Sequence, residues 1–453
     1  MASNAVKHKV HTLRSLWQGT FRKNATTIGI ATIVSRVLGY VREVLMASVF
    51  GTSLFTDAWL MASVLPNLLF GALYGAVSNL IVPLYLEAKE DSRRKSADQF
   101  LQEIFTLLTV LAVVMSIAAY FGTPLIVRGI APGFHGLQYH LTVTMTRIML
   151  PTFLFWLWAG LFSALLQSLN IYGPPAWAPV LLNIVRITFI ILLGRIIGIE
   201  GVAWGFTVGV GLQLVILIRG ISKCQLQLRF RWSMRHTSTK KFIRLSGPVI
   251  FTSLTGAMGV IVDRIFASSL PIGTIAALNY SFLLVQVPIG LLIAPLVTPT
   301  FTRLSQRAVK GDRDAWTKVL LRSTFLLTTV MFVITGFIFF TSTRIIRIVY
   351  QHGMFNSTST ALTSSILPYF AIGLIPMALN QLLLKALVSL QKTNSLVLLT
   401  IMATMTNITV DAILVHVMQG RGLALGTALA QLVSAMGFAY ILVRYKPTQT
   451  TNL

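Results

Sequence analysis

The residues best placed for chemistry are charged side chains that lie inside long apolar stretches of the chain. A charge at the centre of a bilayer costs about 2.5–3.5 kcal/mol on insertion scales, so each of these residues should face a partner or a watery cavity. Cations outnumber acids among them, which makes the apolar region net positive. In chain order they are Arg36, Arg42, Glu43, Asp57 (at the edge of a stretch), Arg147, Arg186, Asp263, Arg264, Lys385 and Asp411.

The first apolar stretch carries the densest group. Arg36 and Glu43 are seven residues apart, so on a helix they share one face, and Arg42 lies on an adjacent face. Asp263 and Arg264 occupy the equivalent place in a later stretch. Neighbouring residues of a helix do not face each other, so we expect Arg42 and Arg264 either to pair across helices or to point into the space between two lobes.

Guanidinium groups bind phosphate through two parallel hydrogen bonds, so a cationic cavity favours an anionic head group such as a lipid-linked diphosphate. The predicted substrate-binding residues are Arg36, Arg42 and Arg264. The predicted supporting or coupling residues are Glu43, Asp57, Asp263 and Arg147. The competing interpretation is structural: Arg36 with Glu43, and Arg42 with Asp263, would be buried pairs that hold helices together.

Enzymatic and metal chemistry have no support in the sequence. Cys224 is the single cysteine, no nucleotide-binding Gly-Lys-Ser/Thr motif or His-Glu-x-x-His motif occurs, and no paired acids or activated nucleophile stand out. We therefore predict no catalytic residue, no metal and no cofactor.

The composition decides which elements carry these residues. Of 453 residues, 55% are hydrophobic and only 11% are charged, and the mean hydropathy is +0.76. These are too few charges to coat soluble domains, so the chain is predicted to be an all-α polytopic membrane protein. Stretches long enough to span a bilayer number about twelve. They are residues 26–50, 57–86, 100–122, 141–169, 176–197, 201–219, 242–269, 276–302, 319–342, 359–390, 395–417 and 422–443.

The net charge of +25 follows the predicted topology. With the N-terminus inside, most Lys and Arg residues outside the spans fall in cytoplasmic segments, which places both termini in the cytoplasm. The excess of positive charge is then explained without a nucleic acid partner. Residues 1–25 place apolar side chains at helical spacing among basic ones, which predicts either an amphipathic helix on anionic lipids or a disordered basic tail. Residues 444–453 form a cytoplasmic tail.

The two halves of the chain resemble each other at an offset near 220 residues. Among the matches, residues 182–184 align with 406–408 and residues 201–205 with 422–426. Six spans per copy give both copies the same orientation, so the prediction is a parallel repeat of two six-helix lobes, 26–219 and 242–443. Residues 220–241 join them as a cytoplasmic linker. Transporters built from such repeats hold their substrate between the halves.

Several motifs of the chain resemble the MurJ (MviN) family of lipid II flippases, in the multidrug/oligosaccharidyl-lipid/polysaccharide (MOP) exporter superfamily, which includes the MATE transporters. The resemblance covers about residues 26–440 and is most specific in the first span. The motifs are 35–43 (SRVLGYVRE), 50–51 (FG), 57–58 (DA), 65–69 (LPNLL), 131–134 (APGF), 147–151 (RIMLP), 178–183 (APVLLN), 262–265 (VDRI), 288–290 (PIG) and 353–355 (GMF).

This resemblance implies two six-helix lobes around a central cavity that opens alternately inward and outward. It implies movement of an undecaprenyl-diphosphate-linked peptidoglycan precursor across the bacterial inner membrane, with the cell-wall synthesis machinery as a partner. In the family, cavity arginines of helices one and seven are functional, and Arg36, Arg42 and Arg264 match those positions. Asp57 matches the family's aspartate at the opening of helix two.

The chain departs from the family pattern at three places. Phe70-Gly71 stands where the family usually has an arginine pair, Tyr280-Ser281 stands in place of charged residues of helix eight, and the chain stops after twelve spans where typical members have two more. Other readings therefore stay open: a flippase for another lipid-linked oligosaccharide, a cation-coupled small-molecule exporter using Asp57, Asp263 or Asp411, or a non-transporting scaffold of cell-wall assembly.

Overall fold

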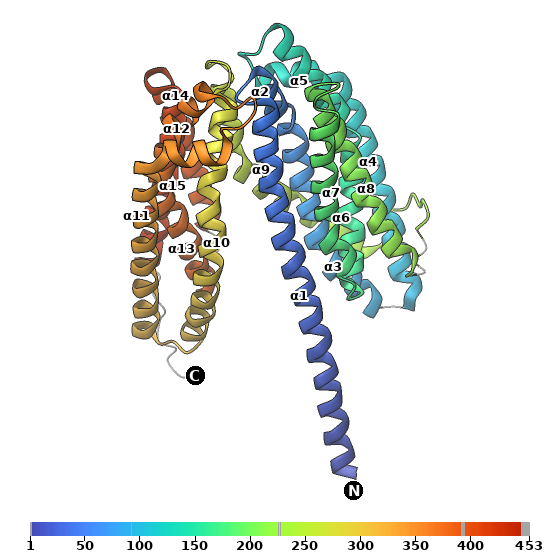
Figure 1. The fold of residues 1–453 in the computed structure, drawn as a ribbon. Helices are drawn as coiled ribbons and strands as arrows, with labels where there is room; N and C mark the ends of the chain where they lie inside the picture. The colour runs from blue at the N-terminus through green and yellow to red at the C-terminus, as the bar shows by residue number, and fades with distance from the viewer. Residues whose placement is uncertain (1, 92, 225, 227, 391–394, 445–453) are drawn as a thin grey trace. The chain divides into compact units, whose positions relative to one another are not determined.

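A computed structural model describes residues 2–91, 93–224, 226, 228–390 and 395–444, with side chains except at 2–23, 68–69, 91, 93–95, 256, 294 and 395–397. Within these residues the fold is built from helices joined by short connections (Figure 1). In chain order they are α1 (Ala2–Phe50), α2 (Leu54–Ala62), the π-helix η1 (Pro66–Phe70), α3 (Gly71–Asp91), α4 (Arg93–Ile130), α5 (Gly136–Met149), α6 (Thr152–Ser168), α7 (Gly173–Leu192), α8 (Ile199–Ser222), α9 (Thr237–Ala267), α10 (Thr274–Val309), α11 (Arg313–Tyr350), α12 (Ser357–Ile372), α13 (Leu374–Ser389), α14 (Ser395–Met418) and α15 (Gly420–Arg444).

Every apolar stretch that the sequence predicts as a span coincides with one helix or with consecutive helices. The stretches 57–86, 141–169 and 359–390 are divided, and the breaks in the first two fall beside a proline. Pro66 begins the π-helix and Pro151 precedes α6. A proline has no N–H to donate and clashes with the preceding turn, so a long apolar stretch bends or divides there.

Fewer helices pass a test for membrane spanning than the twelve that we predict from the sequence. Within the described residues, nine helices or helix pairs are long and apolar enough, and ten if the bent helix α9 counts as one span. The stretches 26–50 and 57–86 fall outside this set. The first carries Arg36, Arg42 and Glu43, and the second is divided by the π-helix, so neither offers one long, sufficiently apolar helix.

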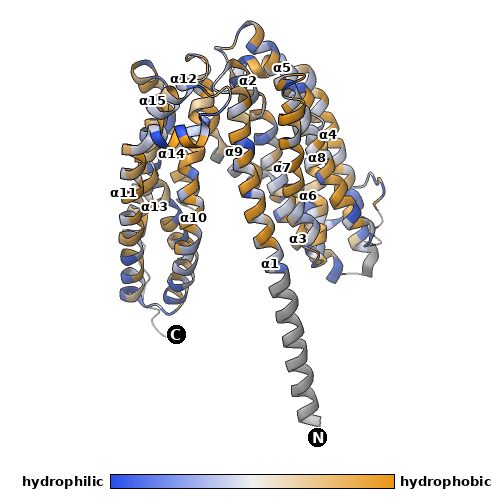
Figure 2. Cartoon of the chain, in the orientation of Figure 1, coloured by the Kyte–Doolittle hydropathy of each residue, from blue (hydrophilic) through white to orange (hydrophobic). Residues whose placement is uncertain are grey.

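The helices that pass expose apolar side chains to their surroundings, as membrane helices do. Figure 2 shows hydrophilic residues gathered near the first turns of α11 and mostly hydrophobic ones along its middle. Phe325, Phe332 and Phe340 of α11 are 74%, 69% and 86% exposed. Such a surface would be unfavourable in water and is suited to lipid.

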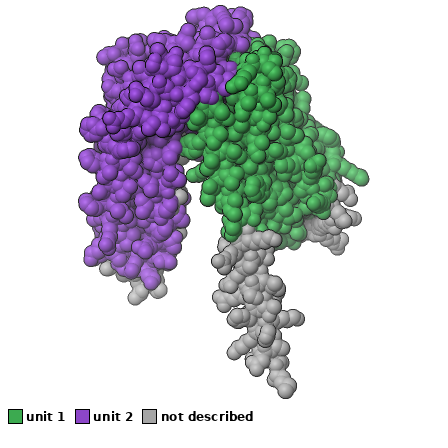
Figure 3. All heavy atoms as spheres, in the orientation of Figure 1, with its two compact units in different colours: residues 1–45, 65–123, 143–251 green, residues 46–64, 124–142, 252–453 purple. Residues whose placement is uncertain are grey.

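The chain divides into two compact units (Figure 3). Unit 1 comprises residues 1–45, 65–123 and 143–251, and unit 2 comprises 46–64, 124–142 and 252–453. In unit 1, α3 packs on α6, α6 on α8 and α7 on α8; in unit 2, α10 packs on α11, α12 and α13, and α15 packs on α13 and α14. The lobe boundaries predicted above remain predictions. The predicted amphipathic character of residues 1–25 and the predicted tail 444–453 concern segments that lie largely outside the described side chains.

Glycines allow the closest helix pairs in both units. A Cβ on Gly205 of α8 would lie 2.5 Å from the Cβ of Phe189 in α7. A Cβ on Gly422 of α15 would lie 2.5 Å from a backbone oxygen of α14. The sequence repeat aligns Gly201 with Gly422 and Gly205 with Gly426, so the aligned glycines serve the same kind of contact in each copy.

Candidate functional site

Arg42 is held in unit 1 by two side chains. Its Nη1 donates to Asn183 Oδ1 at 2.7 Å and its Nε donates to Glu43 Oε1 at 3.1 Å. Arg42 and Glu43 are adjacent in α1, where we expected no pairing, but both side chains are long enough to meet across the helix surface. The exposed fractions of 19% and 17% place this ion pair largely away from solvent.

Asn183 ties the same cluster to the backbone of α1. Its Nδ2 donates to the carbonyl oxygen and the hydroxyl of Ser35, at 3.2 Å each. One turn along α7, the guanidinium of Arg186 lies over the ring of Phe206, with Cζ 5.1 Å from its centroid. The guanidinium of Arg186 interacts electrostatically with the charges of Arg42 and Glu43. Two cations and one acid thus leave one positive charge in excess.

The other predicted residues of unit 1 occupy separate places. Arg36 is exposed on α1, one turn before Tyr40. Arg147 of α5 donates from Nε to the backbone carbonyl oxygen of Tyr120 at 3.3 Å. Its Cζ also lies over the aromatic ring of Tyr120, 4.7 Å from the ring centroid. Arg147 therefore links α5 to α4.

In unit 2, Arg264 donates from Nη1 to the carbonyl oxygen of Leu60 at 2.7 Å. Leu60 lies in the last turn of α2, where unpaired carbonyl oxygens concentrate negative partial charge, so a guanidinium is well placed there. Arg264 also lines a cavity of unit 2.

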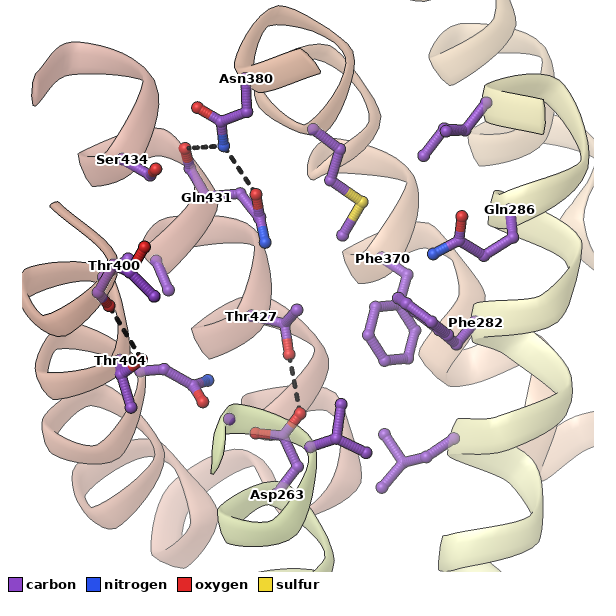
Figure 4. Close-up of a pocket in the computed structure, with 18 of the residues that line it drawn as sticks. Asp263, Phe282, Gln286, Phe370, Asn380, Thr400, Thr404, Thr427, Gln431 and Ser434 are labelled. Carbon is purple, nitrogen blue, oxygen red and sulfur yellow. Dashed lines mark hydrogen bonds between the residues drawn. The ribbon is translucent and has the colours of Figure 1, made fainter. Parts of the chain in front are cut away.

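Asp263 belongs to a cluster of oxygen-bearing side chains beside Arg264. The hydroxyl of Thr427 in α15 donates to Asp263 Oδ2 at 3.1 Å (Figure 4). Within α14, the side-chain amide of Asn407 donates to Asp411 Oδ2 at 3.0 Å. The Oδ1 atoms of Asp263 and Asp411 are buried and have no hydrogen-bond donor among the residues that the structure describes. Desolvated acceptors of this kind are costly unless a cation or a proton joins them.

Among the described residues, the ligand atoms that this cluster offers are carboxylate, amide and hydroxyl oxygens, which suit a hard cation or a proton. A group of three or more His, Cys, Asp or Glu residues suited to a metal does not occur in the described parts of the chain. The sequence singled out Asp263 and Asp411 but not Asn407 or Thr427. The repeat that aligns residues 182–184 with 406–408 was the available signal, because it places an asparagine at a polar cluster in each unit.

Asp57 of α2 contacts the N-terminal end of α10 through its side chain. Its Oδ2 accepts from the backbone N–H of Gly273 at 2.6 Å and its Oδ1 from that of Ala276 at 2.8 Å. The preceding turn needs a glycine: Gly273 has φ of +89°, and a Cβ there would lie 2.5 Å from the carbonyl oxygen of Thr52. The side chain of Asp57, which is only 2% exposed, thus caps the N-terminus of α10 by accepting hydrogen bonds from its first free N–H groups.

The family model of the lipid II flippase MurJ matches residues 46–453. The chain belongs to the MurJ family. This confirms the family resemblance, the helical membrane fold and the transporter class predicted from the sequence.

Among MurJ relatives, the lipid II flippase MurJ of Burkholderia cenocepacia is 30% identical over 375 residues, which are 80% of this chain and 72% of that protein. The probable lipid II flippase MurJ of Buchnera aphidicola is 27% identical over 420 residues, covering 91% and 82% of the two chains.

Solved structures agree on the fold. A lipid II flippase MurJ in an inward closed conformation superimposes with a TM-score of 0.81 at 26% identity, covering 92% of this chain and 87% of that one. An inward-facing MATE transporter of the MOP superfamily has a TM-score of 0.77 at 13% identity, covering 93% and 98%. The MATE likeness shows the fold alone.

Proposed function

We propose that this protein moves lipid II, the lipid-linked peptidoglycan precursor, from the inner to the outer leaflet of a bacterial inner membrane by alternating access. Membership of the MurJ family is the observation that carries this proposal. The arginine cluster of unit 1 supports it, because a substrate with a diphosphate group needs buried cations, and this cluster has one positive charge in excess.

Arg42 is the central residue of the proposed phosphate contact. Asn183 and Glu43 hold its guanidinium in one orientation, so little side-chain freedom is lost when an anion binds. We assign Arg36 and Arg264 to the same task, each within its own unit, and Arg186 as an additional cation beside Arg42. Glu43 and Arg147 are supporting residues, and Asp57 supports the start of α10.

We propose Asp263, with Asp411, as the coupling site. A ligand shifts a conformational equilibrium only if it binds the two states differently. Two buried carboxylate oxygens without donors favour uptake of a proton or a monovalent cation, and a change in helix packing between α9, α14 and α15 would change that affinity.

We also propose that both termini lie in the cytoplasm and that the basic inner segments contact anionic lipids, following the distribution of Lys and Arg residues. The machinery of cell-wall synthesis is the proposed protein partner, because it supplies and consumes this class of substrate.

The experiment is complementation in a bacterium depleted of its essential lipid II flippase. The unmodified chain should restore growth, whereas Arg42→Ala and Arg264→Ala should not. In reconstituted vesicles each substitution should slow lipid II translocation about ten- to a hundredfold, the range expected for losing a charge-assisted hydrogen bond. Arg344→Ala is the matched control, since Arg344 is exposed on α11 and should leave both readouts unchanged.

Normal translocation by both Arg42→Ala and Arg264→Ala, at wild-type protein levels, would contradict phosphate capture by these arginines. Absence of lipid II translocation by the unmodified chain in vesicles would contradict the flippase proposal itself.

A non-transporting scaffold of cell-wall assembly is the second candidate function. The observation that favours it is the loss of family charges. Phe70 stacks on Phe153 with ring centroids 4.5 Å apart, and Tyr280 is fully buried against Tyr350 and Phe355. Growth rescue by the arginine variants together with the wild type, without translocation in vesicles, would favour this function.

A further inference from the structure

Unit 2 contains a cavity of about 630 Å³ among helices α9, α10, α12, α13, α14 and α15 (Figure 4). This volume lies within the range of about 300–1,000 Å³ that is usual for small-molecule sites. The Asp263 cluster and Arg264 lie at its edge, but most of the lining belongs to neither.

Apolar side chains make up about half of the lining, and its polar side chains are uncharged except for Asp263 and Arg264. Six carboxamides from four helices line it: Asn279 and Gln286 of α10, Asn380 and Gln381 of α13, Asn407 of α14 and Gln431 of α15. The hydroxyl groups of Thr404, Thr427 and Ser434 line it as well. Neutral groups that both donate and accept hydrogen bonds suit a ligand rich in hydroxyl and amide groups.

Part of this hydrogen-bonding capacity is unused within the protein. Asn380 donates from Nδ2 to Gln431 Oε1 at 2.6 Å, but its own Oδ1 is buried and lacks a donor in the described part of the chain. Gln431 uses its carbonyl oxygen in that bond, which leaves its Nε2 to donate elsewhere. Gln286 points into the cavity from α10 (Figure 4).

Phenylalanine rings line the cavity together with these carboxamides. Phe282 and Phe370 meet with ring centroids 5.6 Å apart and both line the cavity. Aromatic faces beside carboxamides form an amphipathic surface, which matches a sugar ring with its apolar C–H face and its polar edge.

Three other occupants fit less well. A lipid tail would leave the buried carboxamides unpaired, at a cost of about 1–3 kcal/mol for each group. A diphosphate would find one guanidinium, Arg264, which already donates to Leu60. A cationic drug would find mainly neutral groups beside Asp263.

We propose that this cavity binds the saccharide part of the lipid-linked head group, with an N-acetylated sugar hydrogen-bonded to Asn380, Gln431 and Gln286. This inference rests on the proposed function, because that function supplies a sugar joined to a polyprenyl diphosphate. It assigns sugar selectivity to unit 2 and makes the cavity a determinant of which lipid-linked glycan is carried.

The test measures dissociation constants of the full chain in lipid nanodiscs for two probes: polyprenyl diphosphate and polyprenyl diphosphate that carries a single N-acetylglucosamine. The unmodified protein should prefer the glycosylated probe about tenfold or more, which corresponds to one or two good hydrogen bonds. Gln286→Met and Asn380→Leu should each remove most of this preference while leaving the affinity for the bare diphosphate unchanged.

Gln306→Met is the matched control, because Gln306 is an exposed carboxamide on the same helix α10 and does not line the cavity. It should keep the full preference. Because Gln286→Met lies on α10 and Asn380→Leu on α13, the test can still be read from one variant if the other fails to fold.

Equal binding of both probes by the unmodified protein, or an unchanged preference in both pocket variants, would each overturn the saccharide assignment and leave the proposed function standing. Binding of neither probe would instead contradict the proposed function.

Discussion

At the residue scale, Gly426 decides the position of the Asp411 carboxylate. A Cβ on Gly426 would lie 1.9 Å from Asp411 Oδ1, far inside van der Waals contact. Asp411 is completely buried and its Oδ2 accepts from Asn407. The carboxylate can therefore stay in the cluster with Asp263 only while residue 426 has no side chain.

We predict that Gly426→Ala displaces this carboxylate and weakens coupling. Translocation should slow about tenfold, as is usual when a group that orients a binding residue is lost, and its dependence on cations or pH should change. Gly336→Ala is the control: Gly336 is also inside a helix, α11, but has open space around it, so translocation should not change. Equal translocation by the two variants would contradict a role for Asp411.

At the element scale, helices α7 and α8 pack closely because α8 presents a row of glycines. Gly201, Gly205 and Gly209 follow one another at intervals of four residues and face α7. In a membrane, where apolar burial between helices drives association little, such close backbone approach supplies the packing energy. The same helix α7 carries Asn183, so this packing also positions the partner of Arg42.

Gly205→Ala should therefore push α8 away from α7 and destabilise unit 1 by about 1–3 kcal/mol, the usual cost of overpacking. Thermal unfolding in detergent measures it. Gly211→Ala on the same helix should be tolerated, because its Cβ would meet Phe155 only at an ordinary 3.7 Å. If both variants unfold at the wild-type temperature, the glycine contact does not hold this pair together.

At the scale of the whole molecule, basic residues outside the spans predict the topology. The last turns of α11 contain two basic residues, Arg344 and Arg347, whereas the segment from the end of α8 into the first turn of α9 contains six, Lys223, Arg229, Arg231, Arg235, Lys240 and Lys241. If α9, α10 and α11 each cross the membrane once, the predicted topology puts the last turns of α11 and this linker on opposite sides.

This topology is tested by cysteine labelling, after replacing the single native cysteine by Cys224→Ser. Trp232→Cys, at a position 73% exposed, should react with an impermeant maleimide only after the inner membrane is permeabilised. Ile348→Cys, at a position 76% exposed in the last turn of α11, should react in intact spheroplasts. The opposite pattern would place both termini outside.

Much of the candidate site was predictable, but its partners were not. Arg42, Asp263 and Arg264 stand out in sequence because a charge in an apolar stretch is costly and therefore rare. That Arg42 is held by Asn183, or that Asp57 reaches the N–H groups of Gly273 and Ala276, depends on residues more than a hundred positions apart. Helical periodicity carries no information on such contacts.

The sequence by itself determined the membrane class, the approximate extent of the helices and the family resemblance, because hydropathy and motifs are local properties that solvent and backbone chemistry impose on each segment. The tertiary structure alone decided where the long stretches divide, which oxygens surround Asp263 and Asp411, and that carboxamides from several helices enclose one cavity in unit 2. These features arise from how helices pack against each other, and packing depends on shape and on glycine contacts between segments distant in the chain.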